Sequence, residues 1–298
     1  MKIIEIDIHN ISLQENKINL VLGYFDGVHI GHQEMINKAI KEGPTGIMTF
    51  DISPSFILGK SIKYSHITSL FDKANIFKRM GVKYLYILRV SKVLLDLSKD
   101  DFIEKILKPI NPNEIYIGKD YHFGKNGEGD ASYLKEHFNT HIEELLESGD
   151  TKVSSRQIRE LISEGKMDEV NSLLGRNYQV TGLVVEGHHN GEKTGFPTAN
   201  LELSYPYVLP KIGVYIGYAL VLNSKYKAII SMSTHPTIQE LNDPIIEVHL
   251  LNFKDNLYGK EIEVQFVRYI RNITKFGSLE ELSAQLSKDS ELAKSELK

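Results

Sequence analysis

Two histidines, His29 and His32, lie three residues apart in the glycine-rich stretch 23–32, which has the sequence GYFDGVHIGH. An apolar run at residues 18–22 precedes this stretch and a helical pattern at 34–41 follows it, so the histidines stand where a helix begins. The first N–H groups of a helix lack partners and its dipole is positive there, which attracts anions. Both histidines can therefore stabilise charge that develops on a triphosphate under attack. The alternative is that one histidine caps the helix and the other is solvated.

A second candidate anion site begins at Ser154 and Ser155. Their hydroxyls precede a helical pattern that carries Arg159 one turn further on, and a guanidinium beside free N–H groups favours a phosphate. Serine is also a common helix cap, and arginine is a common surface residue. By itself, this segment is therefore a weaker indication of a binding site than the two histidines.

The stretch 195–200, with the sequence GFPTAN, is a third candidate. Gly187 and Gly191 precede it and predict a flexible loop. Thr198 and Asn200 offer neutral oxygen ligands, which suit a hydrated Mg²⁺ carried by nucleotide phosphates. A turn that leads into a strand explains the same glycine and proline equally well.

Glu247 is a fourth candidate because it lies within an apolar strand pattern. Ile246, Val248 and Leu250 face one side of that strand, whereas Glu247 and His249 face the other. A glutamate in this setting can act as a general base for a substrate hydroxyl. The alternative, which is the commoner case, is a glutamate on the solvated face of a sheet.

The composition limits the class of protein. At 298 residues, the chain has the size at which one core gives way to two domains, and 41% hydrophobic with 25% charged residues is typical of a globular protein. The net charge of −4 argues against broad binding to nucleic acid or to an anionic membrane. The absence of cysteine excludes disulfides and thiolate chemistry. Because the sequence shows no signal peptide and no apolar run of membrane-spanning length, we expect a cytoplasmic protein.

The first part of the chain alternates strand and helix patterns. Such an order predicts an α/β domain with a parallel sheet and helices on both faces. The predicted strands are 3–8, 18–23, 45–50, 83–90 and 114–118, the first of them at an edge. Ligands bind such a sheet at the carboxyl ends of its strands, where the stretch 23–32 lies.

After Gly175 the pattern changes to strands without intervening helices, which predicts an antiparallel barrel or sandwich. We therefore expect two domains, 1–175 and 176–298. The end of the chain is predicted to be a helix, capped by Ser278 and Glu281. The strands predicted for the second domain are 179–186, 213–222, 225–232, 245–253 and 261–271, and the expected apolar stripe of the helix is Leu279, Leu282 and Leu286.

Taken together, these stretches resemble the bacterial bifunctional riboflavin kinase/FMN adenylyltransferase family, the prokaryotic FAD synthetases. The resemblance extends in order over nearly the whole chain. The stretch 23–32 also carries the His-x-Gly-His signature of the wider nucleotidyltransferase superfamily. The other matching stretches are Gly118-x-Asp120-x-x-Phe123–Gly124, Ser154–Ser155 with Arg159, Gly175–Arg176-x-Tyr178, 195–201, Leu209–Pro210, Gly213–Val214–Tyr215, 247–251 and Leu257–Tyr258–Gly259.

The resemblance implies a Rossmann-like nucleotidyltransferase domain followed by an antiparallel β-barrel riboflavin kinase domain that ends in a helix. In the barrel, ATP and Mg²⁺ phosphorylate the 5′-hydroxyl of riboflavin to give FMN. By similarity, Glu247 takes the hydroxyl proton. Thr198 and Asn200 hold the nucleotide phosphates and the metal.

In the N-terminal domain, the resemblance implies that the FMN phosphate attacks the α-phosphorus of a second ATP and gives FAD and pyrophosphate. His29 and His32 stabilise the triphosphate, and charge neutralisation with positioning suffices for such a transfer. The other nucleotide-binding residues implied are Gly23, Phe25, Asp26, Gly31, Ser154, Ser155, Arg159, Gly187, Gly195 and Pro197. The implied flavin-binding residues are Asp120, Phe123 and His235.

The expected partners are small molecules, namely ATP, riboflavin, FMN and FAD, with no nucleic acid and no membrane, and the protein is expected to be a monomer or weak oligomer. Ser231, Ser233 and His235 depart from the family pattern in the kinase half. One alternative is therefore a diverged paralogue that retains only the adenylyltransferase. Two others are a flavin- or nucleotide-binding regulator without turnover, and a nucleotidyltransferase for another phosphorylated metabolite.

Overall fold

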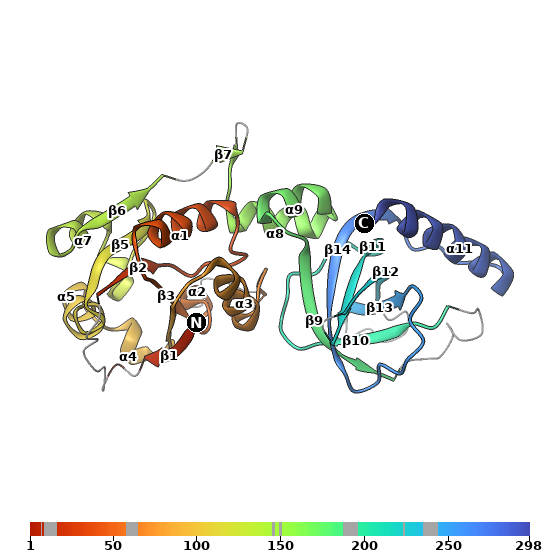
Figure 1. The fold of residues 1–298 in the computed structure, drawn as a ribbon, viewed down its shortest axis with the longest axis horizontal. Helices are drawn as coiled ribbons and strands as arrows, with labels where there is room; N and C mark the ends of the chain where they lie inside the picture. Colours follow the sequence, from red (N-terminus) through yellow and green to blue (C-terminus); the bar gives the residue numbers. More distant parts are fainter. Residues whose placement is uncertain are drawn as a thin grey trace. The chain divides into compact units, whose positions relative to one another are not determined.

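The computed structural model describes residues 1–6, 8, 17–57, 65–144, 147–148, 151–186, 196–222, 224–234 and 244–298. The chain forms two compact units, drawn in Figure 1. The sheet unit comprises Met1–Tyr64 and Thr68–Ser154, and the barrel unit comprises Ser65–Ile67 and Ser155–Lys298. In the described part of the chain, no helix combines the length and the apolar character that crossing a membrane requires.

The sheet unit is built on six parallel strands in the order β1-β4-β3-β2-β5-β6. The predicted parallel sheet is thus confirmed, and its first strand lies at an edge as expected. The strands are β1 (Lys2–Ile6), β2 (Ile18–Leu22), β3 (Thr45–Phe50), β4 (Tyr84–Leu88), β5 (Pro112–Gly118) and β6 (Thr140–Glu143).

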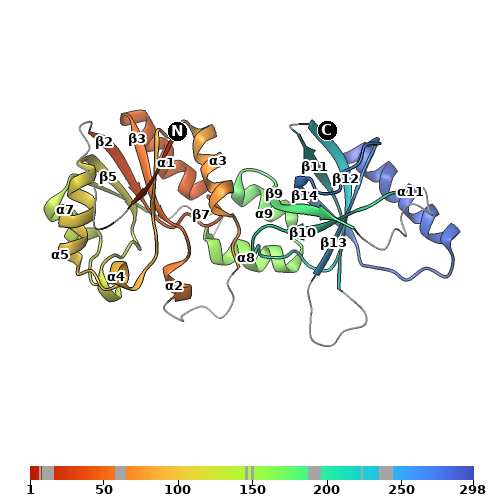
Figure 2. The same cartoon turned by 90° about the horizontal axis from the view of Figure 1, so that it is seen from below.

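Each face of this sheet has its own buried cluster. Figure 2 shows helices on both sides of the sheet. On one face, α1 (Ile30–Glu42) and α3 (Leu70–Met80) pack through residues such as Ile36 and Phe77. On the other face, residues such as Leu94, Ile106 and Leu134 pack against the sheet. They come from α4 (Lys92–Leu95), from the continuous helical segment α5 (Lys99–Phe102), η1 (Ile103–Leu107) and α6 (Lys108–Ile110), and from α7 (Ala131–His137).

The strand order makes β2 the switch point of the sheet. The chain passes from β2 to β3 and β4 on one side, and later returns to β5, which pairs with the opposite edge of β2. Open parallel sheets bind ligands at the carboxyl ends of the strands where the order reverses. The histidine stretch follows β2 directly and therefore lies at this point.

Capping residues close in sequence define the ends of several helices. Ser69 and Asp72 form a reciprocal capping box at the start of α3, and Gly81 ends it in the left-handed conformation with φ of 94°. Ser98 caps α5, and its side chain accepts from the backbone N–H of Asp101. The remaining short elements of the sheet unit are α2 (Pro54–Ile57), η2 (Lys125–Gly127), β7 (Glu147–Ser148) and β8 (Thr151–Lys152).

The barrel unit begins with α8 (Ser155–Glu164) and α9 (Met167–Leu174) and continues as a closed antiparallel barrel in the order β10-β13-β12-β11-β14-β9. The sequence left barrel and sandwich open, and the pairing of β9 with β10 closes the sheet. One strand, β10, was not predicted as such. The strands are β9 (Tyr178–Val185), β10 (Ala199–Leu203), β11 (Gly213–Val221), β12 (Ser224–Thr234), β13 (Pro244–Leu250) and β14 (Glu261–Arg271).

The C-terminal helix α11 (Leu279–Glu296) packs on β11 and β12, beside which it lies in Figure 1. Ser278 caps it as predicted. The expected leucine stripe is wrong in part, because Leu279 is 52% exposed. The buried face includes Asp289 instead, whose carboxylate accepts from Arg271 of β14 at 2.7 Å. A bidentate ion pair with Arg271 therefore fastens the helix where the leucine pattern predicted apolar packing.

Candidate active sites

The two histidines of the sheet unit lie at the first turn of α1. His29 is the N-cap residue, and its Nδ1 accepts from the backbone N–H of His32 at 3.4 Å. Because this nitrogen accepts, the proton of neutral His29 is on Nε2. The two rings stack with centroids 3.6 Å apart. One histidine therefore does cap the helix, but the other is packed against it rather than solvated.

The environment of His32 keeps its ring neutral. Burial, the neighbouring His29 and the charge of Lys73 lower the pKa of His32 well below its ordinary value of 6.5. Its Nδ1 is buried and has no hydrogen-bond partner among the described residues. The edge of His32 also meets the Phe25 ring, with centroids 5.2 Å apart. His32 is therefore a neutral imidazole at neutral pH, and such a ring can donate a hydrogen bond to a phosphate oxygen without carrying a charge itself.

The loop before the histidines is tightly packed. Phe25 is buried against Phe77, and its ring covers Gly23, where a Cβ atom would lie 2.7 Å from the ring. Asp26 is buried too, and its carboxylate accepts from the backbone N–H of Thr68 at 3.3 Å. Gly31 lies in the first turn of α1. Gly23, Phe25 and Asp26 thus shape the loop, and their predicted contacts with a nucleotide remain a proposal.

Ser154 ends the sheet unit, whereas Ser155 opens α8 of the barrel unit and Arg159 lies in the same helix. The Arg159 guanidinium donates to the carbonyl oxygen of Ser65 at 2.6 Å, within the barrel unit. The predicted helix start at Ser155 is confirmed. The participation of these three residues in the histidine site remains a prediction.

Asp120 and Phe123 follow β5 in the sheet unit. Asp120 is exposed, whereas Phe123 is buried against Phe102 with ring centroids 5.4 Å apart. Phe123 therefore contributes to the core of the unit, and its predicted contact with flavin remains untested. The predicted residues Gly187, Gly195 and His235 lie outside the described residues.

In the barrel unit, strand pairing brings the candidate residues together. Asn200 of β10 is directly opposite Glu247 of β13, and Glu247 is opposite Ser231 of β12. Cross-strand partners of this kind have side chains about 5 Å apart on one face of the sheet. Thr198 precedes Asn200 by two residues, just before β10 begins. The prediction that Glu247 and His249 share one face is confirmed by the burial of Ile246, Val248 and Leu250.

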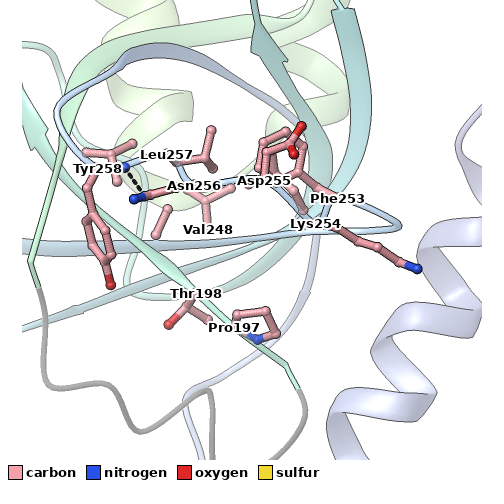
Figure 3. A pocket seen from close by; sticks show the side chains of 12 residues that line it. Pro197, Thr198, Val248, Phe253, Lys254, Asp255, Asn256, Leu257 and Tyr258 are labelled. Carbon is pink, nitrogen blue, oxygen red and sulfur yellow. Dashed lines mark hydrogen bonds between the residues drawn. The ribbon is translucent and has the colours of Figure 1, made fainter.

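A cavity of about 310 Å³ adjoins this group and is drawn in Figure 3. Pro197 and Thr198 form one side of it, and Asn256 and Tyr258 lie across from them. The Asn256 side chain accepts from the backbone N–H of Tyr258 at 2.8 Å, which fixes that wall. This size falls at the lower end of the range for small-molecule sites, and the apolar lining comes from Val184, Ala199, Val248, Leu250, Phe253 and Leu257.

His249 supports the same segment and was not predicted to do so. Its Nδ1–H donates to the carbonyl oxygen of Pro197 at 2.8 Å, and Phe196 packs edge-on against its ring. Burial lowers the pKa of His249, while the bond to Pro197 opposes that shift. His249 thus anchors the residue before Thr198. The only sequence signal for this role was its position on the same strand face as Glu247.

The oxygen donors of this group fit the metal that the resemblance implies. Within the described residues, no cluster of three or more His, Asp or Glu side chains could hold a metal ion by itself. Thr198 and Asn200 supply neutral oxygens, and Asn200 faces the Glu247 carboxylate across the strand pair. Such a set suits a Mg²⁺ that keeps most of its waters and is shared with substrate phosphates.

Comparisons with known proteins match both units of the chain. Residues 11–157 match the family model described as FAD synthetase, and residues 174–297 match that of riboflavin kinase. A bifunctional riboflavin kinase/FMN adenylyltransferase from Listeria monocytogenes is 36% identical, covering 92% of this chain and 90% of that protein. Its counterpart from Bacillus subtilis is 35% identical, covering 96% and 94%. A crystal structure described as a macrolide-efflux protein from Streptococcus pneumoniae has a TM-score of 0.91 and 32% identity, covering 99% of each chain.

The two folds and the two family matches define a transferase with two catalytic domains. Both domains match over nearly the full length of relatives that are more than 30% identical. The chain belongs to the bifunctional riboflavin kinase/FMN adenylyltransferase family. The resemblance inferred from the sequence is thereby confirmed.

Proposed function

We propose that this chain makes FAD from riboflavin in two successive reactions, one in each unit. The barrel unit transfers the γ-phosphoryl group of ATP to the 5′-hydroxyl of riboflavin and releases ADP and FMN. The sheet unit joins FMN to the adenylyl group of a second ATP and releases pyrophosphate. One observation carries the proposal: the reactive residues gather into two groups, the stacked histidines in one unit and the Asn200–Glu247 pair in the other.

In the barrel unit, Glu247 is the general base for riboflavin phosphorylation. Its carboxylate takes the proton of the 5′-hydroxyl as that oxygen attacks the γ-phosphorus and the bond to the ADP oxygen breaks. Thr198 and Asn200 hold the Mg²⁺ that accompanies ATP, and the bound ion neutralises phosphate charge. The cavity beside Thr198 receives the nucleoside of ATP, because its walls are largely apolar and Asn256 and Tyr258 add polar groups.

In the sheet unit, the histidines and the first turn of α1 bind the triphosphate of ATP. A phosphate oxygen of FMN attacks the α-phosphorus, the bond to the bridging oxygen breaks and pyrophosphate leaves, without a nucleophile from the protein. The Nε2–H of His29 and the ring of His32 stabilise the charge that develops on the leaving group. Free N–H groups of the helix contribute in the same direction.

The other predicted residues complete this assignment. The nucleotide contacts in the adenylyl-transfer reaction include Ser154, Ser155 and Arg159, and those in the kinase reaction include Gly187, Gly195 and Pro197. The flavin contacts include Asp120, Phe123 and His235. Small molecules are the only partners that the two reactions require, and the protein acts as a monomer or weak oligomer in the cytoplasm.

One experiment tests the two activities together. Purified protein is incubated with ATP and Mg²⁺, first with riboflavin and then with FMN, and the flavins are separated by chromatography. We expect FMN and FAD from riboflavin, and FAD from FMN. Formation of FAD from FMN alone indicates a paralogue that keeps only the adenylyltransferase. Absence of product from either flavin contradicts the proposal and favours a binding protein without turnover.

A further inference from the structure

A buried lysine lies against the histidine loop. Lys73 of α3 is only 2% exposed, although lysine is almost never fully buried unless its charge is compensated. Its Nζ donates to the carbonyl oxygen of Tyr24 at 2.7 Å and lies 3.7 Å from the centroid of the Tyr24 ring. Tyr24 opens the loop that leads to His29. Among the described residues of the sheet unit, the most buried cation is thus directed at the loop of the adenylyl-transfer site.

That loop has a conformation that needs support. Phe25 and Val28 have φ angles of 55° and 42°, and Gly27 has φ of 82°. A positive φ is a genuine outlier for a β-branched residue such as Val28. A non-glycine residue is strained in this region and persists there only where the surroundings hold it.

The support comes from β3 and from the start of α3. Lys73 and the hydroxyl of Thr49 both donate to the carbonyl oxygen of Tyr24, at 2.7 and 3.0 Å. Thr68 accepts from the backbone N–H of Gly27 at 2.9 Å and donates its own N–H to Asp26. Among these contacts, only the one from Lys73 brings a positive charge. The lysine therefore both fixes the loop and changes its electrostatic potential.

The charge of Lys73 matters because the neutral ring of His32 does not supply one. Two rings stacked at 3.6 Å disfavour two simultaneous positive charges, and burial, the neighbouring His29 and the charge of Lys73 lower the pKa of His32. The titratable groups that act on His32 are His29, from the cap of its own helix, and Lys73, from α3. The carboxylate of the loop, Asp26, accepts from the Thr68 N–H. Lys73 therefore brings an ammonium charge close enough to His32 to act on it.

We propose that Lys73 is a positioning residue of the adenylyl-transfer site: it holds the Tyr24 carbonyl so that residues 25–32 keep their shape, and it brings positive charge beside the histidine loop. The inference rests on the proposed function of the histidine site. It adds a role for a residue that lies 41 positions beyond the His-x-Gly-His signature, on a separate helix.

The test uses the full-length protein and compares Lys73→Met with Lys78→Met, an exposed lysine on the same helix. Wild-type protein must first convert FMN to FAD, since failure there contradicts the proposed function and not the role of Lys73. We expect Lys73→Met to lower kcat/KM for FMN adenylylation by about 100-fold, the scale expected when catalytic groups are misplaced. Phosphorylation of riboflavin by the same sample, and both activities of Lys78→Met, should stay within about twofold of wild type.

The pH profile of adenylylation distinguishes a Lys73 that positions the loop and contributes charge from a Lys73 that only stabilises the fold. Removing the Lys73 charge raises the pKa of His32, so adenylylation by Lys73→Met should begin to fall at a higher pH on acidification than in wild type. Lys73→Arg keeps the charge, so the fall of its activity on acidification (the acid limb of the pH profile) should shift less than in Lys73→Met. A loss of rate with an unchanged acid limb, or adenylylation by Lys73→Met within about threefold of wild type, overturns the proposal.

A second measurement covers the outcome in which Lys73→Met does not fold. The His32 imidazole is then titrated by NMR in wild-type protein and in Lys73→Arg, and the signal is assigned with His32→Gln. A His32 that titrates at its ordinary pKa in wild-type protein overturns the role of the Lys73 charge. A depressed pKa in wild type and in Lys73→Arg, together with adenylylation by Lys73→Arg, supports it.

Discussion

The two reactive sites of this chain are assembled in opposite ways. The histidine site is local in sequence: ten residues contain the loop, the helix cap and both rings, and its shape depends on contacts with β3 and α3. The barrel site is distributed: Asn200, Ser231 and Glu247 come from three strands and meet only through their register.

This difference determines what each site can tolerate. In a local motif, the order of the residues along the chain keeps them together. The histidine loop nevertheless has a strained backbone at Phe25 and Val28, and contacts with the rest of the unit must stabilise it. A distributed site needs no strained residue of this kind, because regular strand geometry places its side chains. It depends instead on the correct register of β10 against β13. The predictions below test whether the two sites are as separate as this contrast implies.

The largest expected effect is that of Glu247→Gln on the kinase reaction. Removing a general base lowers the rate by about 10²–10⁴-fold, so formation of FMN from riboflavin should almost cease. Conversion of FMN to FAD should be spared, as measured by chromatography of the flavins. Glu263→Gln, on the half-buried face of β14, is the matched control and should leave both reactions unchanged. Loss of both reactions in Glu247→Gln would break the assignment of two separate sites.

The reciprocal change, His32→Ala, should act on the other reaction. Loss of one group that stabilises developing charge lowers kcat by about 10²–10³-fold, here for FMN adenylylation. Riboflavin phosphorylation should continue, so FMN should accumulate when riboflavin is supplied. His141→Asn, an exposed histidine in the same unit, serves as the control. A His32→Ala enzyme that still makes FAD from FMN at the wild-type rate would contradict the proposed role of the histidine pair.

A change outside both candidate sites should affect the barrel unit alone. Asp289→Ala leaves the Arg271 guanidinium without its carboxylate partner and should destabilise the barrel unit by about 3 kcal/mol. Kinase activity should then be lost on heating at a lower temperature than adenylylation. Glu291→Ala removes an exposed carboxylate from the same helix and should change neither. Equal thermal loss of both activities in Asp289→Ala would show that the units do not unfold separately.

The smallest effect is on the pH dependence of stability. The pKa of His32 is lower in the folded chain than the ordinary value of 6.5, so below pH 6.5 the unfolded chain binds more protons. Stability from this group is therefore present above that pH and is lost on acidification, by at most about 1.4 kcal/mol per pH unit. Thermal unfolding of wild type and His32→Gln between neutral and mildly acidic pH measures the difference. An identical pH slope in the two proteins would contradict the burial of a neutral ring.

Much of the fold could be predicted because many of its signals are local. Ser69, Ser98 and Ser278 cap helices through their own hydroxyls, and Gly81 takes a left-handed conformation that other residues resist. Strand β10 escaped prediction because its glycine- and proline-containing approach is equally typical of a turn. The predicted leucine stripe of α11 was wrong in part because periodicity indicates which residues share a face, and not which face is buried.

The sequence by itself determined the family, the two catalytic domains and the identity of the candidate residues, because these depend on residue types and spacing along the chain. Only the tertiary structure decided which residues meet. It stacked His29 on His32, placed β2 at the switch point of its sheet and set Asn200 opposite Glu247. It also buried Lys73 against a loop 49 residues earlier in the chain. Contacts between distant segments depend on strand order and packing, which local propensity does not encode.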